Sequence, residues 1–419
     1  MHPLYSWFYA LVSYNLGVSR VALFKFLGLL LLISLFGCGQ EQIVVEASIE
    51  DIQKMQAHRL VAGAYDTCAI DQDGLLFCWG LFNYGSNEDE ESEDSELVVL
   101  EPKRKFDEGG MGPLFGGIWS SQATKCAVTV SGELGCWGNS DSELYVSGYF
   151  GGIHWKQVPW QYPDLTLPLQ GVWTTEIAVG DDALCAISAD QRWLCNLDTV
   201  DLLSIYDENE YYGLEGPGSS PVPNKWTKVS LSENETCAIH ANGSLYCYTF
   251  EESSSDFNFV RIGNDSDWAE LFNGFGSTTC AQKSNGTLHC IGKNEAGQAG
   301  LGHEEAVTQF TQVGLDTDWA KVALGYYHAC GIKTTGTIFC WGIDKSDSET
   351  SRNFTMTPRQ VGVDSDWVDV VTGAWHTCGR KASGKILCWG DNHFGQLGNG
   401  TRQGTDRITP AQYYEIHLK

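Results

Sequence analysis

Short apolar segments alternate with polar turns along most of this 419-residue chain. In residues 68–78 (CAIDQDGLLFC) and 330–340 (CGIKTTGTIFC), two apolar runs flank a short polar turn that contains glycine. Val, Ile, Leu, Phe and Trp dominate such runs, and helical periodicity is not evident beyond the amino-terminal apolar segment. Residues of these types favour strands, so the pattern predicts an all-β fold with many hairpins.

Each predicted hairpin starts and ends on a cysteine. Seven times in the chain, one cysteine is followed by another ten residues later. These pairs account for every cysteine except Cys38: Cys68 and Cys78, Cys126 and Cys136, Cys185 and Cys195, Cys237 and Cys247, Cys280 and Cys290, Cys330 and Cys340, and Cys378 and Cys388. A fixed spacing that recurs in this way identifies a repeat protein, with one hairpin in each copy.

The turn of the hairpin determines which residues pair. Six copies have glycine six residues after the first cysteine: Gly74, Gly132, Gly243, Gly286, Gly336 and Gly384. This position suits a three-residue loop that ends in a left-handed glycine. If residues 72–74 form the loop, Cys68 lies directly opposite Cys78, with Cα atoms about 4.5 Å apart. We therefore predict seven disulfides, each within its own hairpin, rather than zinc sites, which favour clustered CxxC thiols.

Disulfides persist outside a reducing cytosol, and the amino terminus has the features of an export signal. Residues 26–38 (FLGLLLLISLFGC) form an uncharged, mostly apolar run that is preceded by Arg20 and Lys25. This run is too short to span a bilayer comfortably. Leu35-Phe36-Gly37-Cys38 resembles a bacterial lipobox. That resemblance implies cleavage before Cys38 and acylation of this residue, so a lipid would anchor the protein to the membrane. An uncleaved membrane anchor is the alternative.

The charge of the chain is strongly acidic. Lys and Arg total 26 and Asp and Glu total 53, which gives a net charge of −27. Nucleic-acid binding requires a basic surface, and no Lys/Arg cluster supplies one against this field. The sequence therefore predicts an exported acidic protein with no nucleic-acid partner.

Beyond the cysteines, residues 316–342 and 364–400 share a longer pattern that includes CWG. The first is followed by a proline-led strand, TPRQV, at residues 357–361. This pattern resembles the regulator of chromosome condensation repeat. The resemblance implies a seven-bladed β-propeller with four antiparallel strands in each blade. The third copy departs from the pattern, with Gln191 in place of the turn glycine.

These features predict three parts of the chain. Residues 1–37 form a lipoprotein signal peptide, whose true start is Val21 in one interpretation, because twenty residues precede the charged start. Residues 38–55 form a linker, and residues 56–419 form the propeller. Either the tail at 407–415 supplies the fourth strand of the last blade, or residues 43–48 lend a strand to it.

Tryptophans recur in register with the cysteines. One set lies eleven or twelve residues before a first cysteine and another directly follows a second cysteine: Trp268, Trp319 and Trp367, then Trp79, Trp137, Trp341 and Trp389. We predict that they pack between blades, since a four-stranded blade cannot bury both faces alone. His328 and His376, two residues before a first cysteine, also recur in register, which predicts a structural role rather than catalysis.

No reaction chemistry stands out in the sequence. It contains no phosphate-binding glycine loop, no metal-ligand histidine spacing and no GxSxG nucleophile motif, so we expect neither catalysis nor a cofactor. Residues 88–96 (EDEESEDSE) are densely acidic. They lack the alternating ligands and fixed glycine of a calcium loop, so a solvated insertion is the favoured interpretation over a calcium site.

The first three repeats carry the longest insertions, and two of these are rich in aromatic residues. We predict that they form a partner-binding surface on loops: Tyr149, Phe150, Trp155, Trp160 and Tyr162 after Cys136, and Tyr206, Tyr211 and Tyr212 after Cys195. Tyr and Trp supply large contact areas at low entropic cost, which suits recognition. The alternative is that these rings pack the loops against the propeller itself.

Together, the sequence predicts a monomeric lipoprotein of the bacterial cell envelope, on the outer membrane or cell surface, whose propeller binds an unidentified protein without catalysis. The family resemblance also implies two named functions. Nucleotide exchange on a nuclear GTPase conflicts with export, whereas inhibition of a secreted β-lactamase fits the compartment. A carbohydrate-binding or hydrolytic role is a further alternative, with the aromatic rings as sugar platforms.

Overall fold

The computed structural model describes only part of the chain. The described residues are 59–81, 98–105, 114–122, 124–129, 134–137, 148–150, 153–157, 176–180, 183–187, 191, 193–197, 225–231, 235–249, 259–345, 353–406 and 413–418. All of them belong to the larger of two compact units, Val45–Lys419. The predicted signal peptide, linker and acidic insertion lie outside these residues, as does Cys38.

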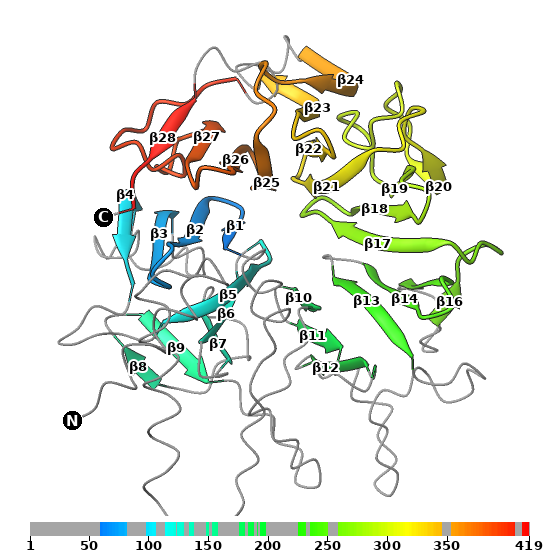
Figure 1. Ribbon diagram of the computed structural model, residues 1–419, viewed down its shortest axis with the longest axis horizontal. Coiled ribbons are helices and arrows are strands. Elements are labelled where there is room, and N and C mark those ends of the chain that lie inside the picture. The colour runs from blue at the N-terminus through cyan, green and yellow to red at the C-terminus, as the bar shows by residue number, and fades with distance from the viewer. Residues whose placement is uncertain are drawn as a thin grey trace, which may run out of the picture. The chain divides into compact units, whose positions relative to one another are not determined.

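The described residues form antiparallel sheets, numbered 1 to 7 in chain order and labelled by strand in Figure 1. Five have four strands that follow one another along the chain. Sheet 1 contains β1 (Leu60–Ala62), β2 (Asp66–Ile70), β3 (Leu76–Leu81) and β4 (Val98–Arg104). Sheet 4 contains β13 (Trp226–Leu231), β14 (Glu235–His240), β15 (Leu245–Thr249) and β16 (Phe259–Arg261). Sheet 5 contains β17 (Trp268–Asn273), β18 (Thr278–Lys283), β19 (Leu288–Gly292) and β20 (Val307–Gln312).

Sheets 6 and 7 repeat this arrangement at the carboxyl end. Sheet 6 contains β21 (Trp319–Leu324), β22 (His328–Lys333), β23 (Ile338–Lys345) and β24 (Asn353–Gln360). Sheet 7 contains β25 (Trp367–Thr372), β26 (His376–Lys381), β27 (Ile386–Gly390) and β28 (Tyr414–Ile416). Because β28 pairs with β27, the carboxyl-terminal tail supplies the fourth strand of sheet 7. Residues 43–48, the alternative donor, lie outside the described residues.

Sheets 2 and 3 depart from four strands. Sheet 2 has the order β5 (Phe115–Ser120), β6 (Lys125–Thr129), β7 (Leu134–Trp137), β9 (Ile153–Gln157) and β8 (Gly148–Phe150). The described part of sheet 3 has β10 (Ile177–Val179), β11 (Ala183–Ile187) and β12 (Trp193–Leu197).

The first strands of neighbouring sheets contact one another in a closed cycle. The contacts run in the order β1, β5, β10, β13, β17, β21, β25 and back to β1. Four-stranded antiparallel sheets whose first strands meet around a common centre define a β-propeller. The predicted all-β propeller fold is therefore confirmed.

The hairpin register matches the prediction. The Asp71 amide donates to the Leu75 carbonyl, and Cys68 lies directly opposite Cys78, with Cα atoms 4.1 Å apart. The turn residue Gly74 has φ +85°. Gly132, the equivalent turn glycine of sheet 2, lies outside the described residues.

The other cysteine pairs repeat this geometry. Six pairs lie at disulfide-bonding distance, with Cα atoms 4.0 to 4.1 Å apart: Cys68 and Cys78, Cys126 and Cys136, Cys237 and Cys247, Cys280 and Cys290, Cys330 and Cys340, and Cys378 and Cys388. In the remaining hairpin, Cys185 lies directly opposite Cys195. Each cysteine therefore faces the partner that the ten-residue spacing predicted, and the formation of seven bridges in the native protein stays a prediction.

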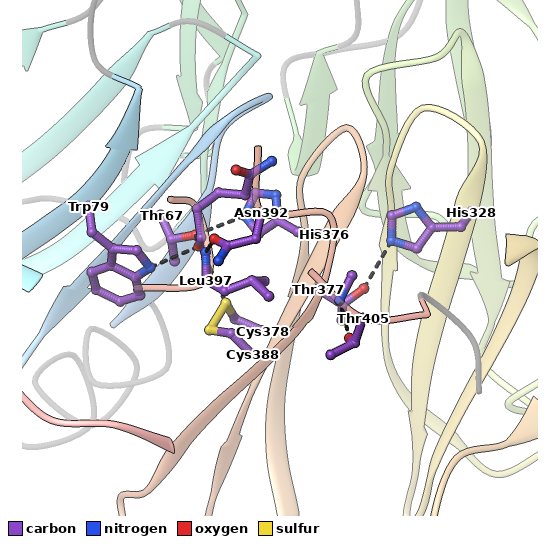
Figure 2. Close-up of a disulfide and its surroundings, with 12 residues drawn as sticks. Thr67, Trp79, His328, His376, Thr377, Cys378, Cys388, Asn392, Leu397 and Thr405 are labelled. Atoms are coloured by element: carbon purple, nitrogen blue, oxygen red, sulfur yellow. Dashed lines mark hydrogen bonds between the residues drawn. A yellow bond between two sulfur atoms is a disulfide. The ribbon is translucent and has the colours of Figure 1, made fainter. Parts of the chain in front are cut away.

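The core is divided among the sheet interfaces. At the interface of sheets 7 and 1, Cys378 and Cys388 form a buried cluster with Trp79 (Figure 2). Sheet 6 covers the cysteine pair of sheet 5 in the same way with Trp319 and Trp341. The corresponding clusters at other interfaces include Trp137, Trp226, Trp268, Trp367 and Trp389. The predicted packing of tryptophans between blades is confirmed.

Among the described residues, no helix is both long enough and apolar enough to cross a membrane.

Candidate functional site

The predicted partner-binding residues do not form one site within the described part of the chain. Tyr149 and Phe150 lie in β8, and Trp155 lies in β9. The other predicted residues lie outside the described residues: Trp160, Tyr162, Tyr206, Tyr211 and Tyr212.

The expectation that the aromatic insertion after Cys136 is a loop is wrong for these described residues. Strand β9 pairs with β7, with Lys156 opposite Cys136, and β8 pairs with β9. The insertion therefore supplies the outer strands of sheet 2. The insertion pairs with β7 through backbone hydrogen bonds. The residue types alone did not indicate this pairing.

His328 and His376 join neighbouring sheets, as their structural interpretation predicted. Each ring is fully buried, and its Nε2 atom lies within hydrogen-bonding distance of a threonine hydroxyl in the next sheet (Figure 2). The His328–Thr377 distance is 2.9 Å and the His376–Thr67 distance is 2.8 Å.

In sheet 1, an acid occupies the position of these histidines. Asp66 forms a buried ion pair with Lys125 of sheet 2, with an N–O distance of 2.7 Å. Burial raises the pKa of Asp66, against the opposing effect of Lys125. The same contact between successive sheets is thus made by a His–Thr pair at two interfaces and by an Asp–Lys pair at a third.

Burial, assisted by the nearby charge of Lys125, lowers the pKa of His376 to about 3. A group with so low a pKa is a poor general base near neutral pH. Within the described residues, no group of three or more His, Cys, Asp or Glu side chains could hold a metal ion. In the described part of the chain, these histidines therefore make structural contacts between sheets and are not arranged for catalysis.

A different set of aromatic residues gathers at the connections between the first and second strands. We call it the aromatic arc and define it by Phe275, Tyr326, Tyr327, Trp375, Tyr65 and Phe394. The connections come from sheets 5, 6, 7 and 1, and Phe394 follows β27 of sheet 7. All six side chains are half-buried.

Glycines bring the connections of neighbouring sheets close together. The amide of Gly373 donates to the carbonyl of His376, which closes a tight turn over Trp375. A Cβ atom on Gly373 would lie 2.6 Å from the carbonyl oxygen of Gly63 in sheet 1. A residue with a side chain would not fit at position 373, so glycine lets sheets 7 and 1 approach closely at this connection. This close approach places the aromatic residues of neighbouring connections next to one another.

Ring contacts link most of the arc. Tyr327 stacks on Trp375 with centroids 4.6 Å apart, and Tyr326 lies 6.3 Å from Phe275. Tyr65 meets Phe394 edge to face at 5.1 Å. Such pairs hold each ring in a preferred geometry, so the arc is a pre-formed surface on a rigid support.

The arc adjoins a central cavity. The cavity has a volume of about 680 Å³ and is lined by residues of the first strands of all seven sheets, together with Phe275 and Gln122. The Tyr326 hydroxyl donates a hydrogen bond to Gln122 Oε1 at 2.8 Å. This bond joins sheet 6 to sheet 2, although these two sheets are not neighbours in the ring. The arc therefore lies beside one end of the cavity.

Charged residues line the cavity toward the beginnings of the first strands. Lys228 lies 2.8 Å from Glu176 and 2.9 Å from Glu270, and Lys321 pairs with Asp369. Each pair joins adjacent sheets. Each of these charged groups has an oppositely charged partner, so we assign them to ring stability and not to a ligand.

The sequence held one signal for the arc that our interpretation missed. Tyr65, Tyr327 and Trp375 each lie three residues before a first cysteine. Tyr327 and Trp375 come from consecutive copies, but Tyr65 joins them only because sheet 7 contacts sheet 1, which the order along the chain does not show.

Comparison with known proteins identifies the repeat. Residues 319–346 and 367–396, in sheets 6 and 7, match the regulator of chromosome condensation (RCC1) repeat. These two segments each carry one RCC1 repeat. No curated protein matches the sequence at a significant level.

Several solved structures share the fold. Prp20p of Saccharomyces cerevisiae has a TM-score of 0.62 and 15% identity, over 88% of this chain and 89% of that chain. Yeast RCC1 (Prp20), solved bound to Kap60, has a TM-score of 0.61 and 14% identity, over 90% of this chain and 89% of that chain. Human WBSCR16 has a TM-score of 0.59 and 13% identity, over 82% of this chain and 95% of that chain. At these identities the similarity shows the fold alone.

Proposed function

We propose that this protein is an exported, lipid-anchored propeller that binds a protein partner through the aromatic arc and catalyses no reaction. The observation that carries the proposal is the arc itself, six half-buried aromatic side chains from adjacent sheets. Tyr and Trp are enriched where binding energy concentrates in protein interfaces, and recognition residues are common on connections held by a rigid scaffold.

The interior supports such a rigid scaffold. Hairpins whose cysteines lie at bonding distance pack beneath tryptophans of the next sheet, and hydrogen bonds cross the interfaces. Trp341 Nε1, for example, donates to the carbonyl of Gln298 in sheet 5 at 2.7 Å. A surface held in this way loses little conformational entropy on binding.

The export proposal rests on the sequence. Disulfides between the paired cysteines would persist only in an oxidising compartment, and Cys38 ends the apolar run at the position of a lipobox cysteine. We propose a bacterial envelope lipoprotein with residues 1–37 removed, a lipid on Cys38 and a monomeric ring of seven blades.

The similar proteins give limited support for the kind of ligand. Prp20p of Saccharomyces cerevisiae has binding properties to Gsp1p and histones. This favours a propeller that acts by protein binding but does not transfer those partners to an exported chain. Inhibition of a secreted enzyme is one form that such binding could take.

Site-specific cross-linking tests the proposal in the native cell. A photo-cross-linking amino acid replaces Tyr327 in the full chain, and a control carries it at Val363, which is 90% exposed in the β24–β25 connection at the far end of β25. We expect a defined protein adduct from position 327 that disappears with Trp375→Ala, and none from position 363. Absence of any adduct at 327, or equal adducts at both positions, would contradict the proposal.

A further inference from the structure

We infer that the aromatic arc takes a Lys- or Arg-rich segment of its partner, with a cationic group over the Trp375–Tyr327 stack beside Asp391. This inference rests on the proposed protein-binding function and names the chemistry of the partner. Cations are attracted to aromatic faces, most strongly to Trp, and a neighbouring carboxylate adds to the attraction.

The residues at the strand connections have the composition that such a ligand needs. Counted from the first cysteine, positions −4 and −3 of the fully described connections are Ala64-Tyr65, Gly276-Ser277, Tyr326-Tyr327 and Ala374-Trp375. Aromatic residues occur at these positions, and Lys and Arg do not.

Asp391 is fixed beside Trp375. Its backbone amide donates to the Trp375 carbonyl at 2.9 Å, and its carboxylate accepts a hydrogen bond from Gln396 at 3.0 Å. The side chain keeps 28% of its surface exposed. His393 Nδ1 lies 3.7 Å from the carboxylate, on a side chain that is 84% exposed. The carboxylate is thus oriented by the protein and still accessible to a ligand.

The molecule already makes the proposed contact internally. In sheet 6, Lys333 Nζ lies 3.6 Å from the Trp319 ring centroid and pairs with Asp318 at 2.6 Å. The same combination of lysine, tryptophan and aspartate recurs in sheets 5 and 7: Lys283 with Trp268 and Asp267, and Lys381 with Trp367 and Asp366. At the arc, Asp391 adjoins Trp375 through their backbone hydrogen bond, so a carboxylate-bearing residue again neighbours an aromatic one, and a partner would supply the cation.

The charge of the whole chain favours the same partner. The net charge is −27. A field of this sign steers cationic segments toward the protein and repels acidic ones, an effect that weakens with salt.

Peptide binding to the purified full-length mature protein tests the inference. The probes are two fluorescent peptides of equal length, one alternating Arg and Gly and one alternating Glu and Gly, measured by anisotropy at slightly alkaline pH in low and high salt. We expect the Arg peptide alone to bind. Trp375→Ala should weaken its binding about tenfold, and Asp391→Asn should weaken it about threefold and reduce its salt dependence.

Two variants provide matched controls. Asp73→Asn removes an exposed carboxylate at the β2–β3 turn, and Val363→Ala removes an exposed apolar side chain. Both should bind like the parent. If Trp375→Ala does not fold, Asp391→Lys leaves the rings in place and should abolish binding.

Three results would overturn the inference: equal binding of the two peptides, unchanged binding by Trp375→Ala, or displacement of the Arg peptide by a neutral oligosaccharide. Failure of the inference can be separated from failure of the proposed function. If the cross-linked adduct at position 327 persists while the Arg peptide does not bind, the arc binds a partner that is not cationic. If neither is observed, the proposed function fails as well.

Discussion

At the scale of single residues, the stability of this protein depends on side chains that cross from one sheet to the next. Trp79 is completely buried, packs with Cys378 and Cys388 of sheet 7, and donates Nε1 to the Gln396 carbonyl at 2.9 Å. His376 makes a parallel connection through Thr67. Each of these contacts pairs two buried polar atoms, which offsets the cost of removing them from water.

His376 gives a pH prediction. Its pKa is about 3 in the folded protein, against an ordinary value of 6.5, because burial and then Lys125 disfavour the charged ring. Below pH 6.5 the unfolded state therefore binds a proton that the folded state does not, so stability falls as the pH falls. The loss should be about 1.4 kcal/mol for each pH unit between 6.5 and the folded value.

Denaturant unfolding of the parent and of His376→Asn, at several pH values from 7 to 4, measures this effect with the cysteine pairs intact. The variant should be less stable at pH 7 and should show a shallower acid slope. The raised pKa of Asp66 acts in the opposite direction, but it is present in both proteins. Identical slopes would show that His376 does not carry the acid sensitivity.

At the scale of elements, the hairpin turn fixes the register that the whole molecule repeats. Gly74, Gly243, Gly286, Gly336 and Gly384 have φ between +78° and +87°. Gln191 occupies this place in sheet 3 with φ 65°, a conformation that costs a residue with a side chain roughly 1–2 kcal/mol. The repeated fold therefore overrides the local preference of Gln191.

Two equivalent turn glycines should respond differently to alanine. Gly384→Ala adds a Cβ atom that meets nothing within 4 Å, so its only cost should be the backbone strain, roughly 1–2 kcal/mol. Gly336→Ala carries the same strain, but its Cβ would also overlap the Ser365 carbonyl oxygen at the next sheet. We expect a clearly larger loss for Gly336→Ala in denaturant unfolding, and equal losses would contradict this description of the interface.

At the scale of the whole molecule, the sequence predicted what repeats and missed what depends on closure of the ring. The spacing of Cys68 and Cys78 around Gly74 was enough to obtain the pairing register, because a tight turn determines it. The pairing of β9 with β7 was missed because an additional strand, β8, lies between them in the chain and pairs with β9, which the residue types do not indicate. The arc was missed because Tyr65 and Trp375 are distant in the chain and become neighbours only when sheet 1 meets sheet 7.

The central claim is that this protein is an exported propeller whose repeats are each cross-linked by an internal disulfide. The most direct test is mass spectrometry of the protein from its native membranes, intact and as peptides, before and after reduction. The account predicts a chain that begins at a lipid-modified Cys38 and seven bridges, each joining cysteines ten residues apart. An unacylated chain that starts at Met1 with free thiols would contradict the claim and reopen an intracellular role.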